Sequence, residues 1–173
     1  MKLLVIDIQK GITDNRLYNF ESFIEKTTSI IKAARDNHIE IIYFQHDDGP
    51  GTGFSIGDEE FEIATQVTPV DGEKVFIKDI NSCFGNNEFV DYIKNEDTLM
   101  IVGLQTNFCI DATVKSAFER GYKVIIPQGT NSTFDNDYMT GEVTYEYYNN
   151  MMWPERFANC VPVDEAIRFM EQV

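Results

Sequence analysis

The sequence has 173 residues, of which 43% are hydrophobic, and its 29 acidic residues outnumber 14 basic ones to give a formal charge of −15 at pH 7. This length suits one domain spanning residues 1–173, with enough chain to bury a sizeable core and little left for a second domain. The negative charge argues against nucleic acid and anionic membranes as partners, because both bind positive surfaces, and leaves small molecules or further copies of the chain.

Two more features bear on location. The first residues, "MKLLVIDIQKG", place an aspartate inside an apolar run and show no small-residue cleavage site, and no apolar run approaches the roughly 20 residues of a membrane helix. Cys83, Cys109 and Cys160 are an odd number of cysteines without the C-x-x-C spacing of a structural metal site. We therefore expect a soluble, cytoplasmic protein with free thiols.

Short apolar runs alternate with helical patterns along the chain. Stretches between the runs repeat apolar residues at a spacing near 3.6, which is typical of amphipathic helices. The five runs of buried-strand length lie at residues 2–7, 39–46, 74–78, 98–104 and 122–127, and the helical patterns at 20–38, 86–95 and 109–121. A last short strand and a helix from about Asp164 close the chain. The alternation predicts a parallel α/β sheet with helices on both faces.

Two segments interrupt this alternation. Residues 47–72, which begin "DDGPGTGFSIG", are too long for an ordinary connection, and we expect them to form a pocket wall. Residues 131–157 are rich in aromatic side chains and are predicted to carry a helix over about 141–152. Because aromatic stripes pack in cores or interfaces more often than over ligands, we expect Trp153 and the nearby tyrosines to lie at the interface of a homodimer or larger homo-oligomer.

Chemically active side chains end several of the predicted strands. In open parallel sheets, ligands bind beyond the carboxyl ends of the strands. Asp7, His46 and Lys78 end three runs, and Cys109 follows a fourth after a short turn. An acid, an imidazole, an ammonium and a thiol are therefore expected to face one crevice, although they are far apart in the sequence.

The sequence suggests how the Cys109 thiol could be activated. If Thr106 or Asn107 caps the following helix, Cys109 lies in its first turn, where the helix dipole and free N–H groups favour a thiolate. A nearby Lys78 ammonium would also lower the pKa of the thiol. Asp7 could accept the thiol proton and later a proton from water as a general base. These groups predict an acyl-transfer site.

Three blocks of the sequence resemble the motifs of the isochorismatase-like cysteine hydrolases. "LLVIDIQKG", the lysine of "KVFIKDINSCF" and "VGLQTNFCIDATVKSAFERGYKV" stand in the family's order and at similar spacing. The resemblance implies a three-layer α/β/α fold with a mainly parallel, six-stranded, Rossmann-like sheet. It also implies catalytic roles for three residues: Cys109 as the nucleophile, Asp7 as the base and Lys78 as the third member of the triad.

The resemblance extends to the turn before Cys109. In this family the peptide that precedes the turn is often cis without proline, which here is Leu104–Gln105, and the backbone N–H groups of Gln105 and Cys109 are expected to form an oxyanion hole. We expect substrate contacts from Gln9, His46, Phe84 and Thr106. Gln105 itself departs from the family pattern, in which a small residue is common at this position, and Cys83 similarly stands where many relatives have a small residue.

His46 raises the question of a metal. Nicotinamidases of this superfamily hold a divalent ion near the second strand through an aspartate and two histidines, whereas this chain has only His38 and His46. Because His38 precedes the second strand, we expect it to face away. We therefore expect neither a metal nor another cofactor.

The leading hypothesis is a cysteine hydrolase that cleaves a C–N bond of a small amide, carbamoyl or lactam substrate through a covalent thioester. A vinyl-ether hydrolase of the isochorismate type is an alternative, since acid catalysis by Asp7 needs no nucleophile. A non-catalytic small-molecule or redox thiol module is a third reading, because Cys83 is expected near Cys109.

Overall fold

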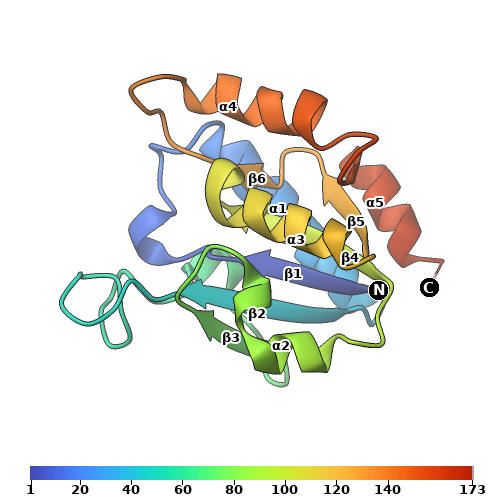
Figure 1. The fold of residues 1–173 in the computed structure, drawn as a ribbon, viewed down its shortest axis with the longest axis horizontal. Helices are drawn as coiled ribbons and strands as arrows, with labels where there is room; N and C mark the ends of the chain where they lie inside the picture. The colour runs from blue at the N-terminus through green and yellow to red at the C-terminus, as the bar shows by residue number, and fades with distance from the viewer. Residues whose placement is uncertain (173) are drawn as a thin grey trace.

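The computed structural model describes residues 1–172 and contains one central parallel sheet with helices packed around it (Figure 1). The strands are β1 (Lys2–Ile6), β2 (Glu40–His46), β3 (Lys74–Lys78), β4 (Thr98–Leu104), β5 (Lys123–Pro127), β6 (Asn131–Ser132) and β7 (Asn159–Val161). The α-helices are α1 (Phe20–Asp36), α2 (Asn87–Tyr92), α3 (Asp111–Glu119), α4 (Gly141–Tyr147) and α5 (Val163–Met170). Each strand predicted from the apolar runs is present within one or two residues of its expected bounds.

All strand pairs of the sheet are parallel. Six strands follow the order β3-β2-β1-β4-β5-β7, and the two-residue β6 pairs with β4 beside this path. The predicted α/β fold with a mainly parallel sheet is confirmed, and β6 is the strand that the sequence pattern did not indicate. The chain runs outward from β1 in one direction and from β4 in the other, so the topological switch point lies between these two strands.

Side chains of β1 alternate between two apolar layers, as the period of a strand requires. Leu3 and Val5 pack on the side that carries α1 and α5, and Leu4 and Ile6 pack on the side that carries α2 and α3. Burial on both faces explains why the strand sequences read as continuous apolar runs rather than as alternating ones. No helix within residues 1–172 is long and apolar enough to cross a membrane.

Gly103 lets β1 and β4 approach closely just before the ends of both strands. Its φ is +132°, and a Cβ added there would lie 2.0 Å from the carbonyl oxygen of Ile6, its register partner on β1. Only glycine fits this position without moving one of the two strands. The position matters for the site because Asp7 follows Ile6 directly.

The two irregular segments both fold back against the sheet. Residues 47–72 project beyond β2 in Figure 1 and return through an isolated bridge between Gln9 and Ile63. Residues 131–157 include β6, α4 and a π-helical turn, η5 (Tyr148–Met152). Together, α4 and η5 match the helix predicted over about 141–152. Trp153 is fully buried, and its indole N–H donates to Asp111, so its expected place at a subunit interface is wrong. Association into a homo-oligomer stays a prediction.

Candidate active site

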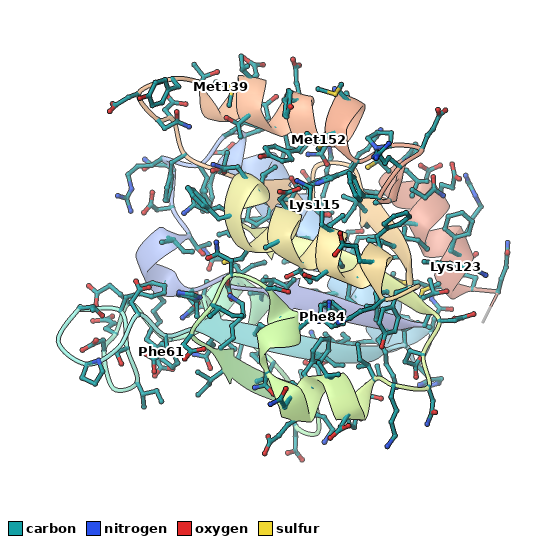
Figure 2. The ribbon with its side chains drawn as sticks, in the orientation of Figure 1. Phe61, Phe84, Lys115, Lys123, Met139 and Met152 are labelled. Carbon is teal, nitrogen blue, oxygen red and sulfur yellow. The ribbon has the colours of Figure 1, made fainter. Side chains whose placement is uncertain are left out.

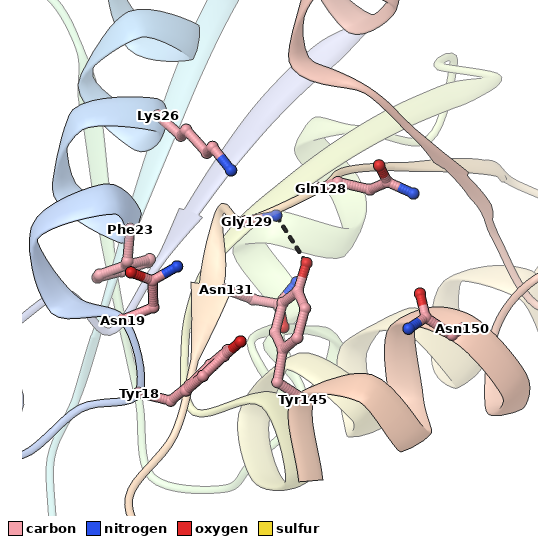
Figure 3. Close-up of a pocket in the computed structure, with 9 residues that line it drawn as sticks. All are labelled: Tyr18, Asn19, Phe23, Lys26, Gln128, Gly129, Asn131, Tyr145 and Asn150. Atoms are coloured by element: carbon pink, nitrogen blue, oxygen red, sulfur yellow. Dashed lines mark hydrogen bonds between the residues drawn. The ribbon is translucent and has the colours of Figure 1, made fainter. Parts of the chain in front are cut away.

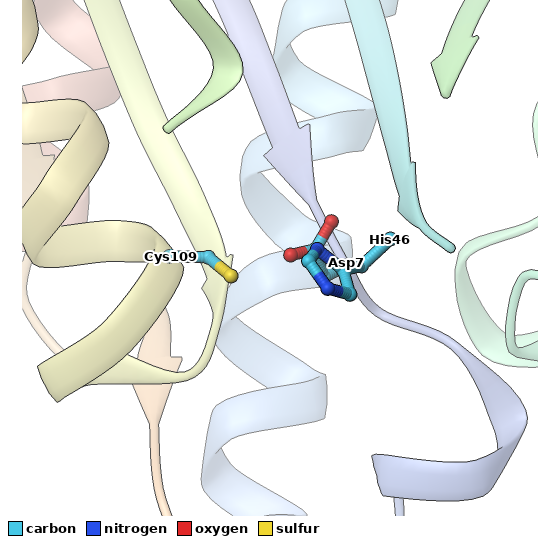
Figure 4. A group of neighbouring side chains, drawn as sticks. All are labelled: Asp7, His46 and Cys109. Atoms are coloured by element: carbon cyan, nitrogen blue, oxygen red, sulfur yellow. The ribbon is translucent and has the colours of Figure 1, made fainter. Parts of the chain in front are cut away.

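The ends of β1, β2 and β4 bring three of the predicted residues together at the topological switch point. Figure 4 shows Asp7, His46 and Cys109 turned toward one another from three different segments. One ligand atom from each lies within 4.8 Å of the others. Asp7 adopts a φ of +52°, in the left-handed region that aspartate tolerates better than most residues. This turn directs the carboxylate back toward the end of β4.

Lys78, the last residue of β3, donates to all three of these side chains. Its Nζ lies 2.7 Å from Asp7 Oδ2, 3.1 Å from His46 Nδ1 and 3.4 Å from Cys109 Sγ. An ammonium has three N–H donors, so each finds an acceptor in this buried cluster. Burial is the largest single effect and disfavours the charged form of Lys78, but the combined interactions with Asp7, Cys83 and Cys109 outweigh it and raise the pKa of the lysine above its ordinary value.

His46 completes the arrangement on the side of residues 47–72. Its Nδ1 faces the Lys78 ammonium, and its Nε2 lies 3.1 Å from Asp48 Oδ1. A neutral imidazole with its proton on Nε2 satisfies both contacts, because Nδ1 then accepts from Lys78 and Nε2 donates to Asp48.

Asp7 has one oxygen that is bound and one that is free. Oδ2 accepts from Lys78, whereas Oδ1 is buried and has no hydrogen-bond partner in the described chain. Burial raises the pKa of the Asp7 carboxyl above its ordinary value, although the charge of Lys78 offsets part of that effect. A buried carboxylate with a free oxygen and a raised pKa is suited to accept a proton from a neighbouring thiol.

The Cys109 thiol differs electrostatically from the expectation. Burial and the charge of Asp7 raise the pKa of the thiol to about 12, and Lys78 only partly opposes them. Neither expected residue caps the helix: Thr106 donates to Asn131 Oδ1, and Asn107 Oδ1 lies 2.7 Å from the Thr133 hydroxyl. The segment begins instead with a π-helical turn, η4 (Thr106–Ile110). The pKa of the thiol is therefore raised where the sequence suggested that it would be lowered, and the thiol depends on a base, the role expected of Asp7.

A cavity of about 260 Å³ opens beside this cluster. The predicted residues Asp7, His46, Gln105 and Cys109 line it. Its other lining residues, which sequence reasoning did not identify, are Ile12, Asp48, Phe54, Asn81 and Phe108. Asn81 Oδ1 accepts from Cys109 Sγ at 3.8 Å, and the position of Asn81 three residues after the end of β3 is a signal that could have indicated it.

The turn before Cys109 has the predicted cis peptide, between Leu104 and Gln105. The Gln105 side chain lines the cavity, and its Oε1 lies 3.0 Å from the hydroxyl of Thr133. Because the carbonyl end of the amide is directed to Thr133, its NH₂ end is free to donate to a bound molecule. The large residue at this position therefore adds a polar group to the cavity.

Three of the four expected substrate contacts lie behind the cavity wall. Gln9 is fully buried and bonds both the N–H and the carbonyl of His46 as well as the carbonyl of Phe61, which holds residues 47–72 against β2. Thr106 is also fully buried. Phe84 packs against Phe89 and Tyr122 between α2 and the sheet (Figure 2), because the short turn after β3 directs its ring inward. Of these four, only His46 lines the cavity.

Asp7, His46 and Cys109 are ligand types that could hold a metal ion. The ammonium of Lys78 already contacts all three of them, at 2.7 to 3.4 Å. A divalent cation bound to the same atoms would meet this positive charge at close range inside a buried site. The residues present therefore fit a lysine-centred cluster better than a metal centre. His38 lies between α1 and the start of β2, whereas His46 lies at the end of that strand.

A separate cavity of about 290 Å³ lies between the start of α1, the β5–β6 connection and α4 (Figure 3). Polar side chains such as Lys26 and Asn150 line it, and Tyr145 accepts from the N–H of Gly129. None of the groups of the Asp7–Lys78–Cys109 cluster reaches it. The chemistry described above therefore belongs to the cavity beside Cys109.

Comparisons with known proteins agree with this geometry. Residues 2–145 match the family model of the isochorismatase domain. The chain is 25% identical over 174 residues to an uncharacterised isochorismatase family protein, YrdC, of Bacillus subtilis (strain 168), with 95% of this chain and 93% of that protein covered. It is also similar to the crystal structure of an isochorismatase family protein, with 27% identity, a TM-score of 0.83 and coverage of 92% of this chain and 96% of that one.

Two other relatives carry names of defined hydrolases. Streptothricin hydrolase of Streptomyces noursei is 23% identical over 137 residues, which cover 77% of this chain and 54% of that protein. N-carbamoylsarcosine amidase of Arthrobacter sp is 28% identical over 112 residues, which cover 64% of this chain and 40% of that protein.

Proposed function

The chain belongs to the isochorismatase family and is a hydrolase, and we propose that it cleaves a C–N bond of a small amide, carbamoyl or lactam substrate through a thioester on Cys109. The observation that carries this proposal is the free oxygen of Asp7 beside a neutral thiol, with Lys78 bonded to both residues. The name of the N-carbamoylsarcosine amidase supports C–N hydrolysis in a relative of this chain, and that of the streptothricin hydrolase supports hydrolysis.

The first half of the reaction forms the thioester. Cys109 Sγ attacks the substrate carbonyl carbon while its proton passes to Asp7. Because the pKa of the thiol is raised to about 12, this coupled transfer avoids the formation of a free thiolate. The carbonyl oxygen becomes an oxyanion, for which the backbone N–H groups of Gln105 and Cys109 are the proposed donors. Collapse of this intermediate breaks the C–N bond, and the nitrogen leaves with the proton held by Asp7.

The second half releases the acid. Asp7, again ionised, takes a proton from water, and the resulting hydroxide oxygen attacks the thioester carbonyl. The C–S bond breaks, and the proton on Asp7 returns to the sulfur of Cys109. Lys78 keeps its proton throughout and stabilises negative charge on Asp7 or sulfur as that charge moves between them.

Replacement of the nucleophile tests the mechanism. An amide or carbamoyl substrate is first found by screening. With the wild-type chain, acid quench during turnover should trap the thioester as a mass adduct. Cys109→Ala should abolish both turnover and this adduct. Cys160→Ala is the matched control, because Cys160 is a free cysteine on β7 outside the cavity, and its removal should preserve both readouts. Turnover by Cys109→Ala at the wild-type rate would overturn the covalent mechanism.

One observation favours a second candidate, hydrolysis of a vinyl ether. The raised pKa of Asp7 allows the residue to hold a proton for acid catalysis without any nucleophile. Pyruvate release from isochorismate that persists in Cys109→Ala would favour this reaction. A redox role is less well supported, because Cys83 is fully buried and burial raises the pKa of its thiol. The free thiols suit a reducing compartment, and we propose the cytoplasm.

A further inference from the structure

A larger cavity adjoins the one beside Cys109. This distal cavity, of about 410 Å³, shares Gln105 and Phe108 with the first cavity. Asn107 lines it from the π-turn η4, and one stretch after β6 completes the wall: Thr133, Phe134, Asp135, Asn136, Asp137 and Tyr138. A substrate that is held at Cys109 and is long enough to reach past Gln105 and Phe108 would enter this space.

The charge of the combined lining is negative. Asp48 in the first cavity and Asp135 and Asp137 in the distal cavity face it, and neither lining contains a lysine or arginine. Asp7 also lines the first cavity, but its charge is balanced by that of Lys78. Arg16 lies over the ring of Phe134, but Asp14 and the carbonyl of Gly11 bind its guanidinium.

The three carboxylates differ in how far they are already engaged. Asp48 lies 3.1 Å from His46 Nε2, and Asp135 Oδ1 accepts from the N–H of Gly141 at the start of α4. Within residues 1–172, the side chain of Asp137 makes no hydrogen bond or ion pair that the structure records. Asp137 is therefore the carboxylate of the distal cavity most available to a bound molecule.

Exposed aromatic rings accompany these carboxylates. Phe108 is 50% exposed where the two cavities meet, and Tyr138 is 94% exposed beside Asp137. Phe134 lines the distal cavity between them. Aromatic faces attract cations through the ring quadrupole, and adjacent carboxylates add a direct charge interaction. Together the two features favour an ammonium or guanidinium group and disfavour a carboxylate.

We infer that the substrate of this hydrolase is cationic, with an ammonium or guanidinium group that occupies the distal cavity while its C–N bond lies beside Cys109. This inference rests on the proposed function and adds the substrate class. A neutral fragment satisfies the first cavity alone, and a substrate with a carboxylate at the same place meets like charge from Asp137 and Asp135.

The charge preference can be measured without a known substrate. Cys109 is alkylated at fixed pH and low ionic strength with three reagents: iodoacetamide, an iodoacetamide that carries a trimethylammonium tail, and iodoacetate. Each rate is divided by the rate of the same reagent with mercaptoethanol, and peptide mass assigns the modification to Cys109. We expect the cationic reagent to react about fivefold faster than the neutral one and the anionic reagent to react slowest, with the order weakened by salt.

Two matched variants locate the effect. Asp137→Asn should reduce the cationic-to-neutral ratio about threefold. Asp91→Asn removes the same charge from an exposed position on α2 outside the cleft and should leave the ratio unchanged. Equal rates for the three normalised reagents, or equal changes in the two variants, would overturn the inference.

A second readout separates this inference from the proposed function. Amides with one scissile bond and an ammonium, hydroxyl or carboxylate tail are compared by kcat/KM, and the ammonium amide should be hydrolysed fastest. Turnover and a Cys109 adduct without any tail preference contradict the inference and leave the function standing. No turnover in the amide series, with the alkylation order retained, contradicts the C–N hydrolase function and supports the cation preference of the cleft.

Discussion

Lys78 binds one oxygen of Asp7 at 2.7 Å and leaves the other oxygen without a hydrogen-bond partner among residues 1–172. The lysine therefore fixes the orientation of the carboxylate without occupying the lone pair that a proton transfer needs. The same ammonium also contacts the sulfur of Cys109, so it is positioned to stabilise negative charge on either side of that transfer.

Asp7→Asn should remove the base without removing the fold. Asparagine tolerates the φ of +52° found at this position, so the turn after β1 is retained, but an amide cannot accept the thiol proton. We expect kcat/KM to fall by about 10² to 10⁴ in steady-state assays. Circular dichroism of the variant checks that it is folded. A variant with turnover near that of the wild type would show that another group is the base.

The acidic limb of the pH–rate profile should report Asp7. Because burial raises the pKa of this carboxyl, the ionised base is lost on acidification before an ordinary carboxyl would be protonated. We expect kcat/KM to decline as the pH falls through a value above 3.8, the ordinary pKa of an aspartate. The residual activity of Asp7→Asn should lack this limb, and an unchanged limb in the variant would assign it to a different group.

The Cys109 thiol should show no thiolate plateau near neutral pH. With a pKa of about 12, its rate of alkylation by iodoacetamide should rise about tenfold per pH unit from pH 7 to 10. Peptide mass spectrometry separates Cys109 from the other two cysteines. A plateau below pH 8 would instead indicate the lowered pKa that the helix start and Lys78 suggested from the sequence.

Lys78→Met should leave Asp7 as a buried charge without its partner. We expect a loss of about 3 to 5 kcal/mol in the free energy of unfolding, measured by urea denaturation. The double variant Asp7→Asn/Lys78→Met should lose less than the two single variants together, because no uncompensated charge remains. Lys115→Met, which breaks a partly exposed pair with Asp111, is the control and should cost about 0.5 kcal/mol. Additive single effects would argue against a buried ion pair.

Gly103→Ala should destabilise the sheet beneath the site. The added methyl group would lie 2.0 Å from the carbonyl oxygen of Ile6, so we expect a loss of about 3 kcal/mol or more on urea unfolding. Gly121→Ala also places alanine at a positive φ, +89°, but in open space, and should cost only about 1 to 2 kcal/mol. Equal losses for the two variants would mean that β1 and β4 move apart without cost.

The sequence allowed the fold and the reactive cluster to be predicted for one reason. Strand length and apolar character locate the ends of β1, β3 and β4, and parallel topology brings those ends together. The pKa of the Cys109 thiol could not be predicted in this way, because it depends on the balance between burial, the charge of Asp7 and the charge of Lys78. That balance is known only from the positions of the surrounding side chains. Phe84 was misassigned because the turn after β3 directs its ring into the core.

The distal cavity was missed for a different reason. Its wall follows β6, and a strand of two residues leaves no apolar pattern for a sequence to reveal. The segment 131–157 was recognised as irregular, but the polar and aromatic residues 133–138 within it have no periodicity that would indicate which way they face.

The chain position of these two parts has a practical consequence. Asp7, Lys78 and Cys109 all lie within the first 109 residues, whereas most of the wall of the distal cavity is one short stretch, 133–138, in a separate connection. Both carboxylates of that wall, Asp135 and Asp137, belong to this stretch. Exchange of residues 134–138 for sequences of other charge, with Thr133 and its contacts to Gln105 and Asn107 retained, is therefore a direct route to engineering new selectivity onto an intact reaction centre.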